Sequence, residues 1–188
     1  MTATPAFRFR HAARRLRAGD VIAYPTEAVY GLGCDPADPH AVARLLNLKS
    51  RPVEKGLILI ADRPGRLQGW ADGPALSDDR LATSWPGPVT WLMPAGPRAP
   101  AWITGGSDRI AVRVTAHPVA SALRRRPSPA RWSPPAPDPR GAQPARTALR
   151  VRTYFDGEVD GILGGAVDRH RGPTEIRRWP DGTVLRAG

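Results

Sequence analysis

The amino-acid sequence predicts an α/β fold in which helices flank a twisted, mixed β-sheet. Short apolar runs of strand length alternate along the chain with longer segments whose apolar residues recur every three to four positions. Proline and glycine residues lie at the boundaries between these segments, where turns are expected. At 188 residues the chain is long enough to bury a core of its own, so we expect a single domain over residues 1–188.

The first third of the chain is expected to hold two helices and two strands. Gly19 is a natural end for the first helix, and Pro25 ends the strand that follows it. Asp35 can serve as the N-cap of the second helix, with Pro36 in its first turn. The run over residues 57–61 is apolar throughout, which is typical of a strand buried on both faces. These segments are helices over residues 7–18 and 36–48 and strands over residues 21–24 and 57–61.

The elements predicted after residue 62 are shorter. Residues 124–143 interrupt them, because this stretch has six prolines and no aliphatic side chain larger than alanine, and it cannot form the interior of a helix or strand. The predicted elements are helical turns over 67–70 and 76–85, strands over 89–93 and 110–114, helices over 117–125 and 144–154, and strands over 161–163, 175–178 and 183–186.

Composition limits the classes of protein to which the chain can belong. No apolar run approaches eighteen residues, and residues 1–10 lack the apolar stretch of a secretory signal. The single cysteine, Cys34, excludes an internal disulfide and a multi-cysteine metal site, and the four histidines have no metal-ligand spacing. We therefore expect a cytoplasmic protein without a metal site of its own.

Positive charge is the dominant electrostatic feature. The formal net charge is +11, which favours a polyanionic partner such as RNA, although an arginine-rich coding bias acting on an ordinary surface is the alternative. Only two of the twenty-eight basic residues are lysines, Lys49 and Lys55. A lysine kept against that bias suggests a compact charge on a phosphate or carboxylate in a tight site, with chance clustering as the alternative.

Six motifs, in order along the chain, resemble those of the YrdC/TsaC family of threonylcarbamoyl-AMP synthases. They are Tyr-Pro-Thr-Glu-Ala-Val-Tyr-Gly-Leu-Gly at 24–33, Lys-Ser-Arg-Pro at 49–52, Lys-Gly-Leu-Ile-Leu-Ile at 55–60, Trp-Pro-Gly-Pro-Val-Thr at 85–90, Ala-Val-Arg-Val-Thr-Ala-His-Pro at 111–118 and Pro-Thr-Glu-Ile-Arg at 173–177. The resemblance implies a YrdC-like fold with a basic concave face. It also implies an enzyme that condenses ATP, L-threonine and bicarbonate into threonylcarbamoyl-adenylate, with Mg²⁺, for threonylcarbamoyladenosine modification of tRNA. Its expected partners are tRNA or double-stranded RNA on the basic face and the machinery that transfers the product to tRNA.

The resemblance also implies roles for individual residues, and each role has a structural alternative. Thr26 and Arg113 are expected to bind L-threonine, but the Thr26 hydroxyl could instead close a turn after Pro25. Arg113 lies on an apolar strand, where a charge is costly unless it is paired with an anion. Glu27 is interpreted as structural, with work as a general base as the alternative, and the catalytic residues stay unknown from the sequence. The residues expected to bind ATP are Lys49, Arg51, Lys55 and Thr174, and those expected to shape the pocket are Pro86, Gly87 and Thr90.

One segment departs from the family pattern. Where the family has a strand and loop rich in serine and threonine, residues 127–143 are rich in proline and arginine, and the pattern resumes at residue 144. In a shifted frame the codons for residues 131–137 permit the missing motif, so we hypothesise two compensating frameshifts, which an independent reading of the coding DNA tests. The alternatives to an active synthase are an inactive frameshifted synthase, a non-catalytic RNA-binding module, and a carbamoyl-adenylate enzyme that acts on another substrate.

Overall fold

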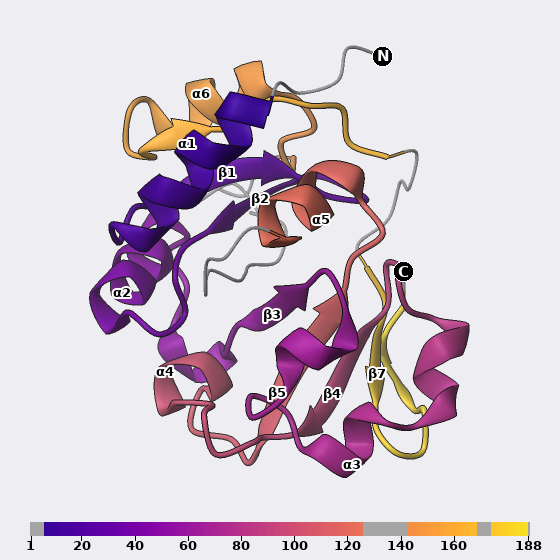
Figure 1. The fold of residues 1–188 in the computed structure, drawn as a ribbon. Coiled ribbons are helices and arrows are strands. Elements are labelled where there is room, and N and C mark those ends of the chain that lie inside the picture. Colours follow the sequence, from indigo (N-terminus) through magenta and orange to yellow (C-terminus); the bar gives the residue numbers. More distant parts are fainter. Residues whose placement is uncertain (1–5, 126–142, 169–173, 188) are drawn as a thin grey trace.

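A computed structural model describes residues 6–125, 143–168 and 174–187 (Figure 1). The helices are α1 (Ala6–Arg17), α2 (Pro39–Leu48), α3 (Gly73–Leu76), α4 (Ala101–Thr104), α5 (Pro118–Arg125) and α6 (Ala148–Phe155). Short 3₁₀ helices span Val53–Lys55, Pro64–Leu67 and Asp79–Thr83. The strands are β1 (Ile22–Pro25), β2 (Tyr30–Gly33), β3 (Ile58–Ala61), β4 (Thr90–Pro94), β5 (Arg109–Val114), β6 (Gly161–Ile162), β7 (Ile176–Arg178) and β8 (Val184–Arg186).

The described strands form two mixed sheets with helices packed around them, as Figure 1 shows. The smaller sheet has the order β2-β1-β6, with β1 antiparallel to β2 and parallel to β6. The larger sheet has the order β3-β5-β4-β7-β8, in which β3 and β5 are parallel and β4 and β5 are antiparallel. The predicted α/β class with mixed strands is therefore confirmed, with the strands divided between two sheets.

Strand β1 is covered on both faces, because successive side chains of a strand point to opposite sides. Ile22 and Tyr24 pack in one apolar cluster with residues of α1 and α5. Val21 and Ala23, which alternate with them, belong to the main core together with residues of α2, α6 and the larger sheet. One core thus extends across both sheets, and it fixes the hairpin between β1 and β2 against β5.

The larger sheet presents one of its faces to a cavity that is described below. The strand register places Leu59, Val112 and Trp91 side by side on one face. Ile58, Ala111 and Leu92 lie side by side on the other face and line the cavity. The same alternation places Arg113, two residues after Ala111, on the cavity side of the sheet.

Two predicted helix starts were wrong, and the capping residues explain both. Helix α2 begins at Pro39 because the Asp38 carboxylate accepts hydrogen bonds from the backbone N–H groups of His40 and Ala41, at 2.9 and 3.2 Å. The Asp35 carboxylate instead accepts from the N–H of Ala37, in the turn before the helix. Helix α6 begins at Ala148 rather than at residue 144, because the Thr147 hydroxyl caps it by accepting from the N–H of Arg150.

The remaining differences concern short elements. The helical turn predicted over 76–85 is a 3₁₀ helix over Asp79–Thr83. Of residues 67–70, only Leu67 is helical, as the last residue of another 3₁₀ helix. Strand β2 and helix α4 were not predicted. The segment 127–143, with its frameshift hypothesis, lies outside the described residues except for Gln143. Within the described parts of the chain, the helices are too short and too polar to cross a membrane.

Candidate functional site

A buried arginine on β5 is the centre of the candidate site. The side chain of Arg113 is 0% exposed, yet its Nε, Nη1 and Nη2 atoms donate no hydrogen bond to any described residue. The nearest described carboxylate oxygen, Oε2 of Glu27, lies 3.6 Å from Nη2, which is longer than a hydrogen bond. A buried guanidinium with unused donors is costly, so Arg113 is suited to an anionic ligand that would accept from it.

Glu27 is held against Arg113 by a second set of contacts from β5. Its Oε1 atom accepts from the Thr115 hydroxyl at 2.5 Å and from the Ala116 N–H at 3.2 Å, while Oε2 has no hydrogen-bond donor among the described residues. Burial acts to raise the pKa of Glu27, but the Arg113 charge and the Thr115 hydroxyl outweigh burial and the pKa is lowered. Glu27 is therefore ionised at neutral pH and fixes one side of the Arg113 guanidinium.

Two buried threonine hydroxyls also lack partners among the described residues. Thr90 at the start of β4 is 0% exposed and Thr174 before β7 is 1% exposed, and neither Oγ1 atom makes a hydrogen bond there. Trp91 pairs with Val112, so the next pair of the antiparallel register places Thr90 opposite Arg113, on the same face of the sheet. Thr90 and Arg113 thus offer a hydroxyl and a guanidinium side by side to one ligand.

Four basic residues are linked in series by their mutual repulsion, and we refer to Lys49, Arg51, Arg186 and Arg113 as the basic cluster. Partial burial and the charge of Arg113 lower the pKa of Arg186, and partial burial and the charge of Arg186 lower the pKa of Arg51. Burial and the charge of Arg51 in turn lower the pKa of Lys49 to about 7. Because the members repel one another, a polyanion that bridges them would be bound strongly.

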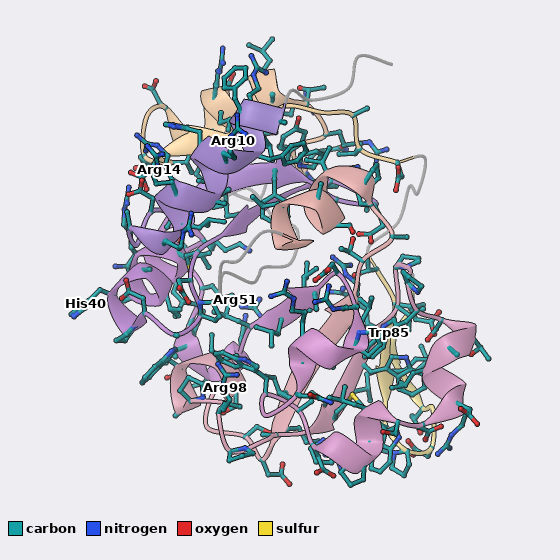
Figure 2. All side chains as sticks on the ribbon, viewed as in Figure 1. Arg10, Arg14, His40, Arg51, Trp85 and Arg98 are labelled. Atoms are coloured by element: carbon teal, nitrogen blue, oxygen red, sulfur yellow. The ribbon has the colours of Figure 1, made fainter. Side chains whose placement is uncertain are left out.

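Backbone contacts hold the outer members of the basic cluster in place. Arg51 donates from Nε and Nη2 to the carbonyl of Gly56 and from Nη2 to the carbonyl of Lys55, at 2.9–3.1 Å. Arg186 donates from Nε and Nη2 to the carbonyl of Thr174, at 3.2 and 2.7 Å. Figure 2 shows Arg51 near the boundary between the two sheets. Neutral carbonyls fix these side chains without cancelling their charge, so the charge stays available for a ligand.

A cavity of about 560 Å³ lies beside the basic cluster, on the inner face of the larger sheet. Its floor is apolar, formed by Ile58, Ala111, Leu92 and Ile176. Four cations, Arg51, Lys55, Arg109 and Arg186, and one carboxylate, Glu54, also line it, so its charged lining is net cationic. An apolar floor beside several cations suits a ligand with a flat ring system and a multiply charged tail.

Two of the predicted site residues, Thr26 and Lys55, are not members of the basic cluster. Thr26 is buried, and its hydroxyl donates to the carbonyl of Val29 at 2.7 Å, which closes the turn between β1 and β2. Its oxygen can still accept a hydrogen bond, so the contact does not exclude a ligand. Lys55 is exposed on the rim of the cavity. Lys49, Arg51 and Arg113 belong to the basic cluster, and the carbonyl of Thr174 accepts from Arg186, so their roles in binding ATP and L-threonine stay predictions.

The Pro86–Gly87 turn packs against the end of β5. The Gly87 N–H donates to the carbonyl of Val114 at 2.9 Å, and the Trp85 indole Nε1 donates to the carbonyl of Val89 at 2.8 Å. Trp85 is marked in Figure 2 beside the larger sheet. A Cβ atom at Gly87 would lie 2.6 Å from the carbonyl oxygen of Ser84, so only glycine fits. This turn sets the position of Thr90 three residues later.

Sequence reasoning missed Arg186 and the role of Glu27. Arg186 lies nine residues beyond the last matched motif, and no local pattern marks it. Glu27 was interpreted as structural, and its contact with Arg113 joins residues that are eighty-six positions apart in the sequence. Among the described residues, no three histidine, cysteine or acidic side chains gather in a way that could hold a metal ion. His170 lies outside those residues.

Comparisons with known proteins agree on one family. The family model for Sua5, YciO and YrdC proteins, described as telomere recombination, matches residues 14–188. The chain is 56% identical over 187 residues to a threonylcarbamoyl-AMP synthase of Alkalilimnicola ehrlichii, covering 98% of this chain and 97% of the relative. It is 50% identical over 183 residues to a threonylcarbamoyl-AMP synthase of Pseudomonas savastanoi pv. phaseolicola, covering 97% and 98%.

Solved structures give the same result for the fold. Sua5 of P. abyssi complexed with L-threonine is similar, with a TM-score of 0.87 and 31% sequence identity, and the match covers 98% of this chain and 55% of that protein. The chain thus spans about half the length of the archaeal protein. E. coli YciO has a TM-score of 0.80 at 24% identity, covering 96% of this chain and 88% of that protein, which is a likeness of fold.

Proposed function

Because the chain belongs to the Sua5/YciO/YrdC family, we propose that it is a threonylcarbamoyl-AMP synthase, which condenses L-threonine, bicarbonate and ATP. Relatives that carry this name match the chain over nearly its whole length at 50–56% identity. The structural observation that supports the proposal most is Arg113, a fully buried guanidinium whose three nitrogens donate to no described residue, beside a cavity whose charged lining is net cationic.

The proposed reaction needs a site that gathers anions. The threonine amine and bicarbonate form a carbamate and release water, and a carbamate oxygen then bonds to the α-phosphorus of ATP while pyrophosphate leaves with the broken P–O bond. The carboxylate of threonine, bicarbonate and the triphosphate all carry negative charge, so they repel one another. Fixed cations that face the reacting phosphorus offset this repulsion and stabilise the charge that grows on pyrophosphate.

Each residue of the candidate site has a proposed task. Arg113 is proposed to bind the carboxylate of L-threonine, with Thr26 contributing to the same subsite. Lys49, Arg51, Lys55 and Thr174 are proposed to bind the ATP phosphates, and the geometry adds Arg186 to them. The apolar floor of the cavity would accept the adenine ring, because a flat aromatic base packs well on an apolar sheet face. Pro86, Gly87 and Thr90 are proposed to shape the pocket.

Magnesium is proposed to arrive with the nucleotide as part of the MgATP substrate. Glu27 is the carboxylate that contacts the basic cluster, and Arg113 and Thr115 already occupy it. Mg²⁺ commonly binds through substrate phosphates with one or two carboxylates and several waters, rather than in an all-protein cage. The chain's own contribution is therefore to hold the phosphates around the ion.

The product is proposed to feed threonylcarbamoyladenosine formation on tRNA, in the cytoplasm, through a partner enzyme that transfers the threonylcarbamoyl group. An RNA contact of the chain itself stays a prediction from the net charge. Both proposals concern what happens after synthesis, so neither is needed for the release of pyrophosphate.

Pyrophosphate release separates the proposed function from the alternatives. The full chain is incubated with MgATP and bicarbonate, with and without L-threonine, and pyrophosphate is measured enzymatically. Release that requires both threonine and bicarbonate supports the synthase. Release that is insensitive to threonine would indicate a carbamoyl-adenylate enzyme for another substrate. A folded chain that releases no pyrophosphate would contradict catalysis by this sequence and leave the frameshifted or RNA-binding alternatives.

A further inference from the structure

Glu27 and Arg113 bring the two sheets into contact at the candidate site. Glu27 lies in the turn between β1 and β2 of the smaller sheet, and Arg113 lies on β5 of the larger sheet (Figure 1). Their side chains are 5% and 0% exposed. Each side chain nevertheless keeps hydrogen-bonding capacity that no described residue uses. Buried polar atoms without partners are costly, so the two side chains are suited to a common ligand.

The unused capacity of Glu27 is one carboxylate oxygen. The other oxygen, Oε1, accepts from the Thr115 hydroxyl at 2.5 Å and from the Ala116 N–H at 3.2 Å. These two contacts hold the carboxylate in one orientation. Oε2 accepts from no described residue and lies 3.6 Å from Nη2 of Arg113. Glu27 therefore offers a fixed, negatively charged acceptor to a donor group of a ligand.

The unused capacity of Arg113 is larger than one oxygen can satisfy. The N–H groups of a guanidinium are carried by three nitrogens, and all three nitrogens of Arg113 lack an acceptor among the described residues. A closer approach of Glu27 would still leave some of these donors unused. The hydroxyl of Thr90, which lies opposite Arg113 in the strand register, also has no described partner. Arg113 and Thr90 together are suited to a carboxylate.

Donors and an anionic acceptor placed this close together match the head group of an α-amino acid. Its carboxylate and its ammonium group are attached to the same carbon atom, so a receptor for both needs opposite charges side by side. Arg113 and Oε2 of Glu27 provide this arrangement. A ligand that has a carboxylate but no amine would still match Arg113, and the charge of Glu27 would repel it. The pair therefore distinguishes an amino acid from a simple carboxylate.

We propose that Oε2 of Glu27 binds the amine of L-threonine while Arg113 binds its carboxylate. The inference rests on the proposed function and extends it, because the tasks proposed above assign no residue to the amine. Burial acts to raise the pKa of Glu27, but the Arg113 charge and the Thr115 hydroxyl outweigh burial and the pKa is lowered. A carboxylate with a lowered pKa is a weak base, so the task of Glu27 is binding rather than general-base catalysis.

The first test uses the full, unmodified chain. Calorimetric titration compares L-threonine with (R)-3-hydroxybutyrate, which is threonine without its amine. No nucleotide or bicarbonate is present, so binding is measured whether or not the chain is catalytic. Threonine should bind at least about tenfold more tightly, because only threonine donates to Glu27. Affinities within about twofold of each other would overturn the inference alone, and absence of threonine binding would overturn it together with the proposed function.

A variant separates amine binding from a purely structural role of Glu27. Glu27→Gln keeps the shape of the side chain and removes its charge. Its affinity for threonine should fall by at least about tenfold, whereas its affinity for (R)-3-hydroxybutyrate should stay the same or rise, because the repulsion is gone. Weaker binding of both ligands would mean that Glu27 only positions Arg113. That result, or an unchanged affinity for threonine, would overturn the inference.

The matched control is Glu158→Gln, which removes the charge of an exposed glutamate outside the candidate site. It should change neither affinity by more than about twofold, because solvent screens an exposed charge. Urea denaturation checks that both variants are folded. The comparison of the two ligands on the unmodified chain does not depend on that check, so a Glu27→Gln variant that fails to fold leaves the inference open to contradiction.

Discussion

Glu27 Oε2 lies 3.6 Å from Nη2 of Arg113, in a position where both side chains are almost completely buried. The pair joins the β1–β2 turn to β5, and the Thr115 hydroxyl holds the other carboxylate oxygen at 2.5 Å. The contact balances the charge of Arg113 but leaves its N–H groups free to donate to a ligand. The buried pair thus makes the anion-binding arginine compatible with the core.

The first prediction concerns this pair. Arg113→Met removes the cation and leaves Glu27 buried without a counter-charge, which should lower the free energy of unfolding by about 3–5 kcal/mol. Adding Glu27→Gln in the same chain should restore much of that loss, because the remaining partner is then neutral. Urea denaturation of the two single variants and the double variant measures the coupling. Additive losses would show that the two side chains do not interact.

The second prediction concerns Lys49, which is 5% exposed. Lys49→Met removes the ammonium group that is proposed to bind the ATP phosphates, so it should slow pyrophosphate release by at least about a hundredfold. The exposed Lys55→Met is the comparison and should slow release less, because solvent screens a charge on the rim. Urea denaturation checks that both variants are folded, and equal rates of release in the two variants would contradict a special role for Lys49.

The third prediction follows from the pKa of about 7 for Lys49 in the ligand-free protein, against an ordinary value of 10.5. The unfolded chain therefore binds more protons than the folded one between pH 7 and pH 10.5, and the contribution of Lys49 to stability rises with pH across that window. ATP should raise this pKa, so ATP affinity is highest below pH 7 and falls by up to about tenfold per pH unit above it. Titration calorimetry at several pH values measures the change, and Lys49→Met should lack this component.

The fourth prediction concerns the turn before β4. Gly87→Ala places a methyl group 2.6 Å from the carbonyl oxygen of Ser84, so the backbone must shift, at a cost of about 1–3 kcal/mol. A Cβ at Gly65 meets no atom within 4 Å, so Gly65→Ala should change stability by about 0.5 kcal/mol or less. Thermal unfolding compares the two variants. Equal melting temperatures would show that the turn adapts and does not fix Thr90.

The sequence predicted most helices and strands well, because the apolar patterns that mark them lie within each segment. The apolar periodicity of α1 and the apolar run of β3 both appeared in the structure within a residue or two of their predicted bounds. Strand β2 was missed because Tyr30–Gly33 has two glycines and pairs through its backbone with β1. Helix α2 begins at Pro39 rather than at the predicted residue 36, because Asp38 supplies the N-cap in place of Asp35.

The candidate site was less accessible from sequence because its defining contacts are non-local. Motifs located Lys49, Arg51 and Arg113, but the series of repulsions that links them runs through Arg186 on β8. The cost of burying Arg113 predicted a partner, and only the fold identified it as Glu27. Thr26 shows the opposite case, because its predicted alternative role as a turn hydroxyl is present in the structure.

Mass spectrometry of the reaction product tests the central claim, that the basic cluster serves adenylate synthesis, most directly. The full chain and its Lys49→Met variant are incubated with MgATP, L-threonine and ¹³C-bicarbonate, and threonylcarbamoyl-adenylate is sought with the label in its carbamoyl carbon. We predict labelled product from the unmodified chain and none from Lys49→Met, although that variant is folded. No product from the folded, unmodified chain, or equal product from both proteins, would contradict the account.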